Sequence, residues 1–137
     1  MSQENVDALR RGYEAFTRGD IDAAFQNFAD DIVWRGTGES VPAGGTYHGI
    51  DEIKNQWLPE FGANYQDFRQ SVEELLDCGD CVVALGTGRF TVSGEEIKGD
   101  FCHVWKFNDE GKVIEVRFFG DTAQTFQALS KQQTPAT

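Results

Sequence analysis

A histidine lies in line with three large aromatic residues in the segment GDFCHVWKFNDEGKV, residues 99–113. Alternate positions of this segment are Phe101, His103, Trp105 and Phe107, and alternate side chains of a β-strand lie on one face of a sheet. Imidazole titrates near neutral pH, so His103 could donate or accept a proton beside an aromatic wall. Two interpretations are open from the residues alone: a histidine that contacts a ligand, or a hydrogen-bonded histidine inside an ordinary core.

Glu39 is the second candidate for acid–base chemistry. It lies in GTGESVPAGG, residues 36–45, whose Gly, Ser and Pro residues predict a loop. If this loop folds over a cavity, desolvation would raise the pKa of Glu39 toward the range useful for a base. The same composition is also typical of a mobile surface loop. Asp121 is expected to cap a helix, and His48 is expected at the surface or in a turn.

The three cysteines are Cys78, Cys81 and Cys102, which are too few and odd in number for a disulfide framework. Cys78-Gly-Asp-Cys81 matches C-x-x-C, but a zinc site needs further ligands and Gly79-Asp80 predicts a hairpin turn. We therefore expect buried or partly buried structural thiols, no metal and no cofactor.

Composition limits the partners of this chain. Its 137 residues carry a formal charge of −11, with 12 basic residues against 23 acidic ones, which argues against binding to nucleic acid or to anionic lipid. No apolar run approaches the length of a signal peptide or a membrane span, so we expect a cytoplasmic protein and no membrane partner.

The order of elements predicts an α+β protein. Apolar spacing indicates helices over residues 3–18, from about 20 to about 31, and from about 49 to about 58, with a short strand at 32–34. From Asp67 onward the period is two, with turns at 79–80, 93–94 and 108–111, and a last helix follows Asp121. We expect one domain over residues 1–130, in which a curved sheet wraps around N-terminal helices, and a flexible tail over 131–137.

Three strings carry a resemblance to a known family: RRGYEAFTRGDIDAAFQNFADDIVW, YHGIDEI and HVWKFNDEGKVIEVRFF. Together they resemble the SnoaL-like proteins related to ketosteroid isomerase, within the nuclear transport factor 2-like (NTF2-like, cystatin-like) superfamily. The resemblance covers residues 6–129 and implies a cone with an apolar pocket. It places His103 where the isomerase has a proton-donating acid. The isomerase base falls on Gly36, and the acid of SnoaL-type cyclases falls on Phe118. Both familiar carboxylates are thus replaced, and the isomerase tyrosine falls on Gly12, one residue before Tyr13.

The resemblance also implies which residues line the pocket. Phe101 and Trp105 flank His103 on the face that would line the cone, and two glycines in the neighbouring strand fit a cavity kept open. The expected ligand-binding residues are Trp34, Trp57, Gly86, Gly88, Phe90, Phe101, Trp105 and Phe118.

Two functions are compatible with this site. In the first, the chain binds a small apolar carbonyl compound and catalyses a cofactor-free acid–base isomerisation or cyclisation, with His103 and Glu39 as catalytic residues. In the second, it is a non-catalytic ligand-binding or dimerisation module. In both, the outward positions Glu115, Arg117 and Phe119 suit a homodimer formed through the outer face of the sheet.

Overall fold

The computed structural model describes residues 2–133. The elements follow in the order α1 (Ser2–Thr17), α2 (Ile21–Ala24), β1 (Phe28–Arg35), β2 (Thr46–His48), α3 (Ile50–Glu52), the π-helical turn η1 (Ile53–Trp57), α4 (Leu58–Asn64), β3 (Gln66–Asp77), β4 (Cys81–Val92), β5 (Glu95–Phe107), β6 (Val113–Gly120) and α5 (Thr122–Gln133). Among these residues no helix is both long and apolar enough to cross a membrane.

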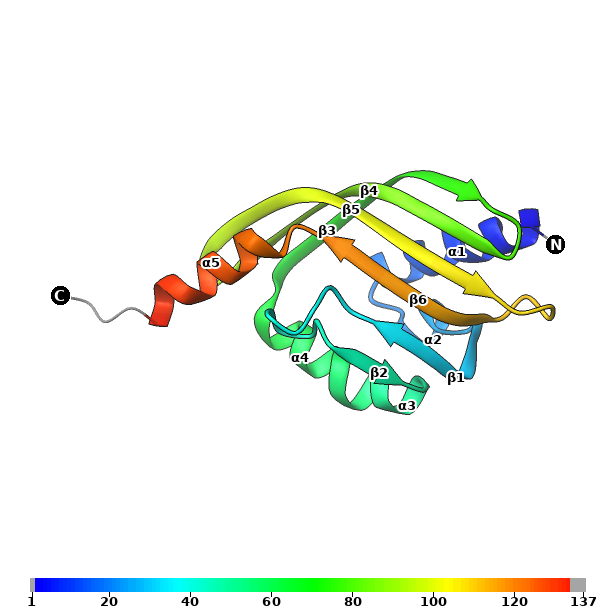
Figure 1. Cartoon of the computed structure of the whole chain (residues 1–137), viewed down its shortest axis with the longest axis horizontal. Helices are drawn as coiled ribbons and strands as arrows, with labels where there is room; N and C mark the ends of the chain where they lie inside the picture. The colour runs from blue at the N-terminus through cyan, green and yellow to red at the C-terminus, as the bar shows by residue number, and fades with distance from the viewer. Residues whose placement is uncertain (1, 134–137) are drawn as a thin grey trace.

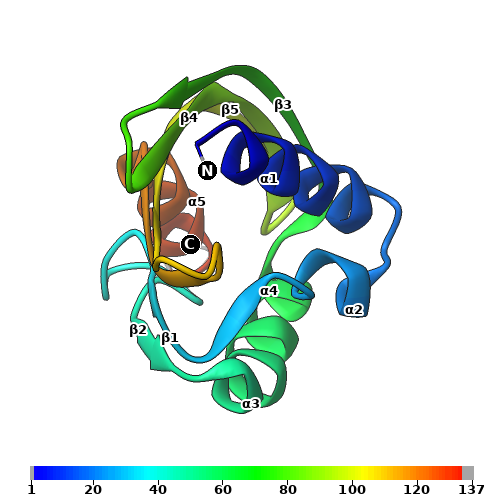
Figure 2. The same ribbon diagram turned by 90° about the vertical axis from the view of Figure 1, so that its right-hand side faces the viewer.

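The strands form one curved sheet in the order β2-β1-β6-β5-β4-β3. All neighbours are antiparallel except β1 and β6, which pair in parallel. Figure 2 shows the strands β3–β5 arching over α1, with α3 and α4 on the opposite side, and Figure 1 shows α5 at one end of the sheet. The predicted α+β fold, with a mixed sheet curved around N-terminal helices, is confirmed.

The alternation in β5 separates an inner face from an outer one. Trp105 and Phe107 are buried, whereas Lys106 between them is exposed. His103 lies on the inner face, opposite Ala84 of β4 and Phe118 of β6. The aromatic row predicted from the sequence is therefore the inner row of a central strand.

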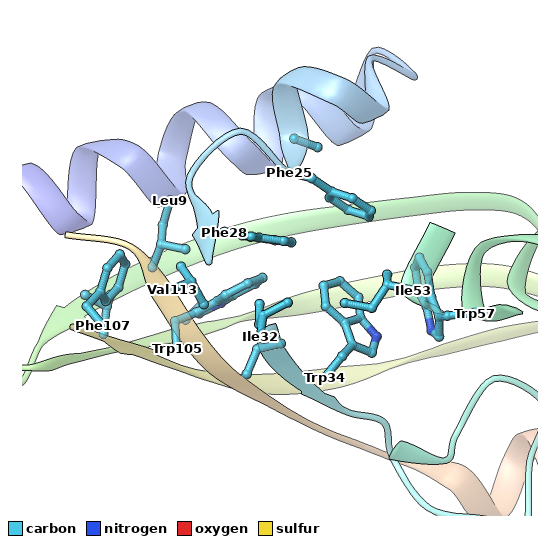
Figure 3. Packing of buried hydrophobic residues seen from close by; sticks show 14 of the residues in the cluster. Leu9, Phe25, Phe28, Ile32, Trp34, Ile53, Trp57, Trp105, Phe107 and Val113 are labelled. Atoms are coloured by element: carbon cyan, nitrogen blue, oxygen red, sulfur yellow. The ribbon is translucent and has the colours of Figure 1, made fainter. Parts of the chain in front are cut away.

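The inner face packs against α1, α2 and η1 through an aromatic core. Phe28 and Trp105 lie with ring centroids 5.8 Å apart, and Trp34 and Trp57 lie 4.8 Å apart. Figure 3 shows these rings in a row along the sheet, with Leu9 of α1 near one end of the row. Burial of such large side chains is the main driving force for holding helices and sheet together.

The prediction for residues 20–31 was partly wrong. The second helix ends at Ala24, and a strand begins at Phe28, although Phe25 and Phe28 follow helical spacing. Pairing of β1 with β6 fully buries Ile32 and leaves Trp34 only 4% exposed. Burial in the sheet thus overrides the local helical pattern.

The third helical segment continues past Pro59, where the prediction ended it. Pro59 lies in the first turn of α4, directly after the π-helical turn η1. Proline lacks the amide proton and crowds the carbonyl four residues earlier, and the wider π turn relieves this crowding. The segment therefore extends to Asn64.

The C-terminal prediction also needs correction. Residues 131–133 belong to α5 instead of to a tail, and residues 134–137 lie outside the described part of the chain. The face of α5 that packs on the sheet uses Thr125 and Ala128, whereas Phe126 is 52% exposed.

Candidate functional site

A cavity of about 680 Å³ lies between α1, η1–α4 and the inner face of the sheet. This volume falls in the range that holds a drug-sized molecule. His103 and seven of the eight predicted ligand-binding residues line it: Trp34, Trp57, Gly88, Phe90, Phe101, Trp105 and Phe118. The wall is therefore largely aromatic, with one imidazole in its middle.

A chain of two hydrogen bonds orients that imidazole. The indole Nε1–H of Trp105 donates to the hydroxyl oxygen of Tyr13 at 2.8 Å, and this hydroxyl lies 2.7 Å from His103 Nδ1. An indole nitrogen can only donate, so the oxygen of Tyr13 accepts from Trp105. We assign the Tyr13 proton to the hydrogen bond with Nδ1, because this hydroxyl has no other acceptor among residues 2–133. The chain then runs in one direction, from Trp105 through Tyr13 to His103.

Burial keeps both titratable groups of this chain uncharged. Desolvation lowers the pKa of His103 from 6.5 to about 3, and it raises the pKa of Tyr13 above its ordinary value. At neutral pH a neutral tyrosine therefore faces a neutral imidazole. Because Nδ1 accepts the hydrogen bond, the proton of the imidazole must be on Nε2.

The second ring nitrogen of His103, Nε2, has no hydrogen-bond partner in the described part of the chain. Among residues 2–133 His103 makes only the hydrogen bond through Nδ1, and its Nε2 is not sealed inside the protein. The Phe101 ring stacks on the imidazole at 4.3 Å, and Phe118 meets it edge-on at 4.6 Å. A polar N–H thus opens into the cavity between two apolar rings.

The loop over residues 36–45 covers the cavity but turns Glu39 outward. Val41 and Ala43 are buried and line the cavity, and Tyr65 donates a 2.7 Å hydrogen bond to the carbonyl of Pro42. Glu39 is exposed and does not line the cavity. The apolar residues of the loop occupy the inward positions, so Glu39 has no place beside His103 in this structure.

Gly86 is the predicted pocket residue that does not line the cavity. A methyl group at Gly86 would lie 2.0 Å from the carbonyl oxygen of Ser71 and 2.7 Å from a ring carbon of Phe101. This glycine therefore lets the Phe101 ring lie against β4. At Gly88, by contrast, the nearest atom would be 3.9 Å away, so Gly88 leaves open space on the inner face.

Comparison with known families agrees with this architecture. The family profile described as "SnoaL-like domain" matches residues 9–116. This chain belongs to the SnoaL-like domain family.

Solved structures resemble this SnoaL-like protein over nearly its whole length. An NTF2-like protein of unknown function from Burkholderia pseudomallei has a TM-score of 0.84 at 28% identity, covering 92% of this chain and 97% of that one. TerC, co-crystallised with polyporic acid, has a TM-score of 0.81 at 27% identity, covering 92% and 98%. An LEH-like epoxide hydrolase from M. tuberculosis, at 18% identity with a TM-score of 0.72 over 95% and 92%, shows the fold alone. No curated protein matches the sequence.

Tyr13 is the member of the SnoaL-like site that the sequence did not reveal. Gly12, where the resemblance to ketosteroid isomerase implied a tyrosine position, packs against α2 with the carbonyl of Ala24 near it. Tyr13 is one residue later, yet α1 directs it into the cavity. The available signal was the spacing of Leu9, Tyr13 and Phe16 on one face of α1, together with a buried tryptophan that needs an acceptor.

Carboxylates reach the cavity only at its rim among the described residues: Glu14, Asp100 and Asp121, all exposed. Asp121 accepts a hydrogen bond from the backbone amide of Ala123, as the capping prediction requires. The side chain of Gln124 also donates to it and lowers its pKa. Within residues 2–133 no three His, Cys, Asp or Glu side chains gather in a group that could hold a metal ion.

Proposed function

We propose that this SnoaL-like protein binds a small, largely apolar molecule through a carbonyl oxygen that accepts a hydrogen bond from His103 Nε2–H. The observation that carries this proposal is the one-way chain from Trp105 through Tyr13 to His103, which leaves Nε2–H as the donor facing the cavity. Hydrogen bonds in such a chain polarise one another, so the last donor is a stronger one than an isolated imidazole.

The rest of the cavity supports an apolar partner. Its aromatic wall offers ring faces and edges for stacking, and Trp34, Phe101 and Phe118 surround the imidazole side of it. The co-crystallisation of TerC, a protein of similar fold and 27% identity, with polyporic acid agrees with a small organic ligand. No cofactor is required for this function.

Acid–base isomerisation or cyclisation is the second candidate function. A neutral donor aimed at a carbonyl oxygen would stabilise the negative charge that develops there when a proton leaves the neighbouring carbon. This function lacks a strong base beside His103. Glu39 points outward, and the lowered pKa of Asp121 makes its carboxylate a weak base. Ligand binding is therefore the better supported function.

We further propose that two copies associate through the outer sheet face. Apolar side chains lie in two neighbouring cross-strand rows: Leu76, Val83 and Val104 in one, and Leu85, Cys102 and Phe119 in the other. Leu76 and Phe119 are 43% and 46% exposed. Arg117 and Glu115 beside this patch carry opposite charges, which suits an interface that pairs with itself by a twofold axis.

The binding proposal is tested with matched pairs of ketones and hydrocarbons, such as 1-tetralone with tetralin and fluorenone with fluorene. Thermal shift and calorimetry should show that the ketone binds about two- to tenfold more tightly than the hydrocarbon, the value of one net hydrogen bond. In His103→Phe this preference should vanish while the hydrocarbon still binds. Glu39→Gln serves as the control and should keep the preference.

Two results would overturn the binding proposal. One is a wild-type protein that does not distinguish ketone from hydrocarbon. The other is a ketone preference that survives in His103→Phe, because the oxygen would then be recognised elsewhere in the cavity.

A further inference from the structure

Two of the three cysteines lie opposite each other at the tip of the β3–β4 hairpin. Cys78 follows the last residue of β3, and Cys81 is the first residue of β4. The backbone amide of Cys78 donates to the carbonyl of Cys81 at 2.8 Å, and the next pair along the hairpin is Asp77 with Val82. Gly79, with φ of +88°, forms the two-residue turn together with Asp80.

This placement brings the two thiols to the same side of the hairpin. Opposite residues of an antiparallel pair project to one face, and hydrogen-bonded pairs have Cα atoms about 5.5 Å apart. That separation lies inside the Cα range of disulfides, about 4.4–6.8 Å. Cys78 is exposed and Cys81 is partly exposed, so a small reagent can reach both. The sequence-based expectation that all three thiols are at least partly buried is therefore wrong for Cys78.

The two sulfur atoms also influence each other. Burial raises the pKa of the Cys81 thiol first, and the neighbouring Cys78 thiol raises it further. Exposed Cys78 is thus the better placed of the two to react first, with Cys81 beside it as the second thiol.

We propose that Cys78 and Cys81 are a redox-active pair that closes to a reversible disulfide by exchange with a small-molecule disulfide such as oxidised glutathione. The thiolate of Cys78 attacks the small disulfide, forms a mixed disulfide and releases one thiol. The thiolate of Cys81 then attacks the Cys78 sulfur and releases the second thiol. Two protein thiols are oxidised, one small disulfide is reduced to two thiols, and the two protein protons end on those thiols.

The geometry favours an easily reduced bond over a permanent one. Side chains of a hydrogen-bonded pair have Cβ atoms toward the upper end of the range of about 4.5–5.5 Å, whereas a disulfide prefers about 3.8 Å, so closure strains the hairpin tip. Strained, exposed disulfides are readily reduced.

Closure at this tip acts on the sheet beyond it. The carbonyl of Asp80 in the turn accepts a 2.8 Å hydrogen bond from the amide of Phe107, which is 3% exposed at the end of β5. The proposed disulfide between Cys78 and Cys81 therefore covalently fixes a turn that is hydrogen-bonded to the neighbouring strand.

Cys102 provides a natural control. It lies on the outer face of β5, opposite Leu85 and Phe119, so no cysteine faces it across either neighbouring strand.

The experiment equilibrates wild type, Cys78→Ser, Cys81→Ser and Cys102→Ser with glutathione buffers from reducing to oxidising. Free thiols are then alkylated and counted by intact mass and peptide mapping, with far-UV circular dichroism to confirm that each variant is folded.

In wild type we expect the count of free thiols to fall from three to one in oxidising buffer, with Cys78 and Cys81 joined within one chain, and to return to three on reduction. Cys102→Ser should lose the same two thiols. Cys78→Ser and Cys81→Ser should form no disulfide within the chain and should carry glutathione on the remaining member of the pair instead.

Three outcomes would overturn this proposal. The first is that Cys78 and Cys81 both stay open to alkylation in the most oxidising buffer. The second is a stable glutathione adduct on wild-type Cys78 with Cys81 still free. The third is a disulfide that joins two chains instead of closing within one.

Discussion

Tyr13 and His103 are 90 residues apart in the sequence, yet the Tyr13 hydroxyl lies 2.7 Å from His103 Nδ1, with the two rings only 16° from parallel. One comes from the first helix and the other from the central strand of the sheet. Their contact joins the packing of α1 on the sheet to the orientation of the only imidazole that lines the cavity among residues 2–133.

Replacing Tyr13 with Phe should destabilise the protein and weaken ligand selection together. The change leaves Nδ1 of His103 and Nε1 of Trp105 without their partner, and each unsatisfied buried group costs about 1–3 kcal/mol. Urea unfolding measures the loss. The control is Tyr47→Phe, whose hydroxyl donates to exposed Glu60 at 3.1 Å and should matter less. Equal losses in the two variants would contradict the special role of Tyr13.

His103 should make the protein less stable as the pH falls below about 6.5. Its pKa is lowered to about 3 in the folded state, so between these values the unfolded chain binds more protons than the folded one. The stability present above pH 6.5 is lost at up to about 1.4 kcal/mol per pH unit as the pH falls through this window. The difference between wild type and His103→Phe, measured by urea unfolding from pH 8 to pH 4, isolates this contribution from the carboxylates. Parallel curves would show that His103 is not buried in its neutral form.

The two strand glycines should respond differently to alanine. In Gly86→Ala the new methyl meets the Ser71 carbonyl and the Phe101 ring, so we expect a loss of about 1–3 kcal/mol or more from overpacking. In Gly88→Ala the methyl enters open space, so stability should change by less than about 0.5 kcal/mol. The methyl at Gly88 should instead weaken binding of the larger ketones. Thermal unfolding measures the stability of both variants, and calorimetry measures ketone binding to Gly88→Ala. A Gly86→Ala protein as stable as wild type would contradict the expected overpacking.

A charge on the outer sheet face should separate the proposed dimer. Phe119→Glu places a carboxylate within the apolar patch of β3–β6, and light scattering at micromolar concentration should then show a monomer where wild type shows a dimer. Phe126→Glu is the matched control, because Phe126 is similarly exposed but lies on α5. A monomeric wild type, or dissociation by the control alone, would refute this interface.

Local patterns predicted the hairpins of this fold well, because turns such as Gly79-Asp80 and the alternation around His103 depend on neighbours in the sequence. They failed where a distant partner decides the conformation. Phe28 follows a helical spacing but lies in a strand because β6 pairs with it. Sequence patterns do not assign Tyr13 to the site because its partners, His103 and Trp105, come from β5. They do not predict that Glu39 points outward, because this depends on which loop residues fill the cavity mouth.

The most direct test is the protonation of the His103 imidazole, measured by ¹⁵N-resolved NMR from pH 8 to pH 4. We predict that at neutral pH His103 is uncharged, with the proton on Nε2 and a bare Nδ1, and that it stays largely uncharged down to pH 4 because burial lowers its pKa to about 3. We also predict that a bound ketone shifts the Nε2–H signal. A proton on Nδ1, or a His103 that becomes charged near the ordinary histidine pKa of 6.5, would contradict the donor chain and the function built on it.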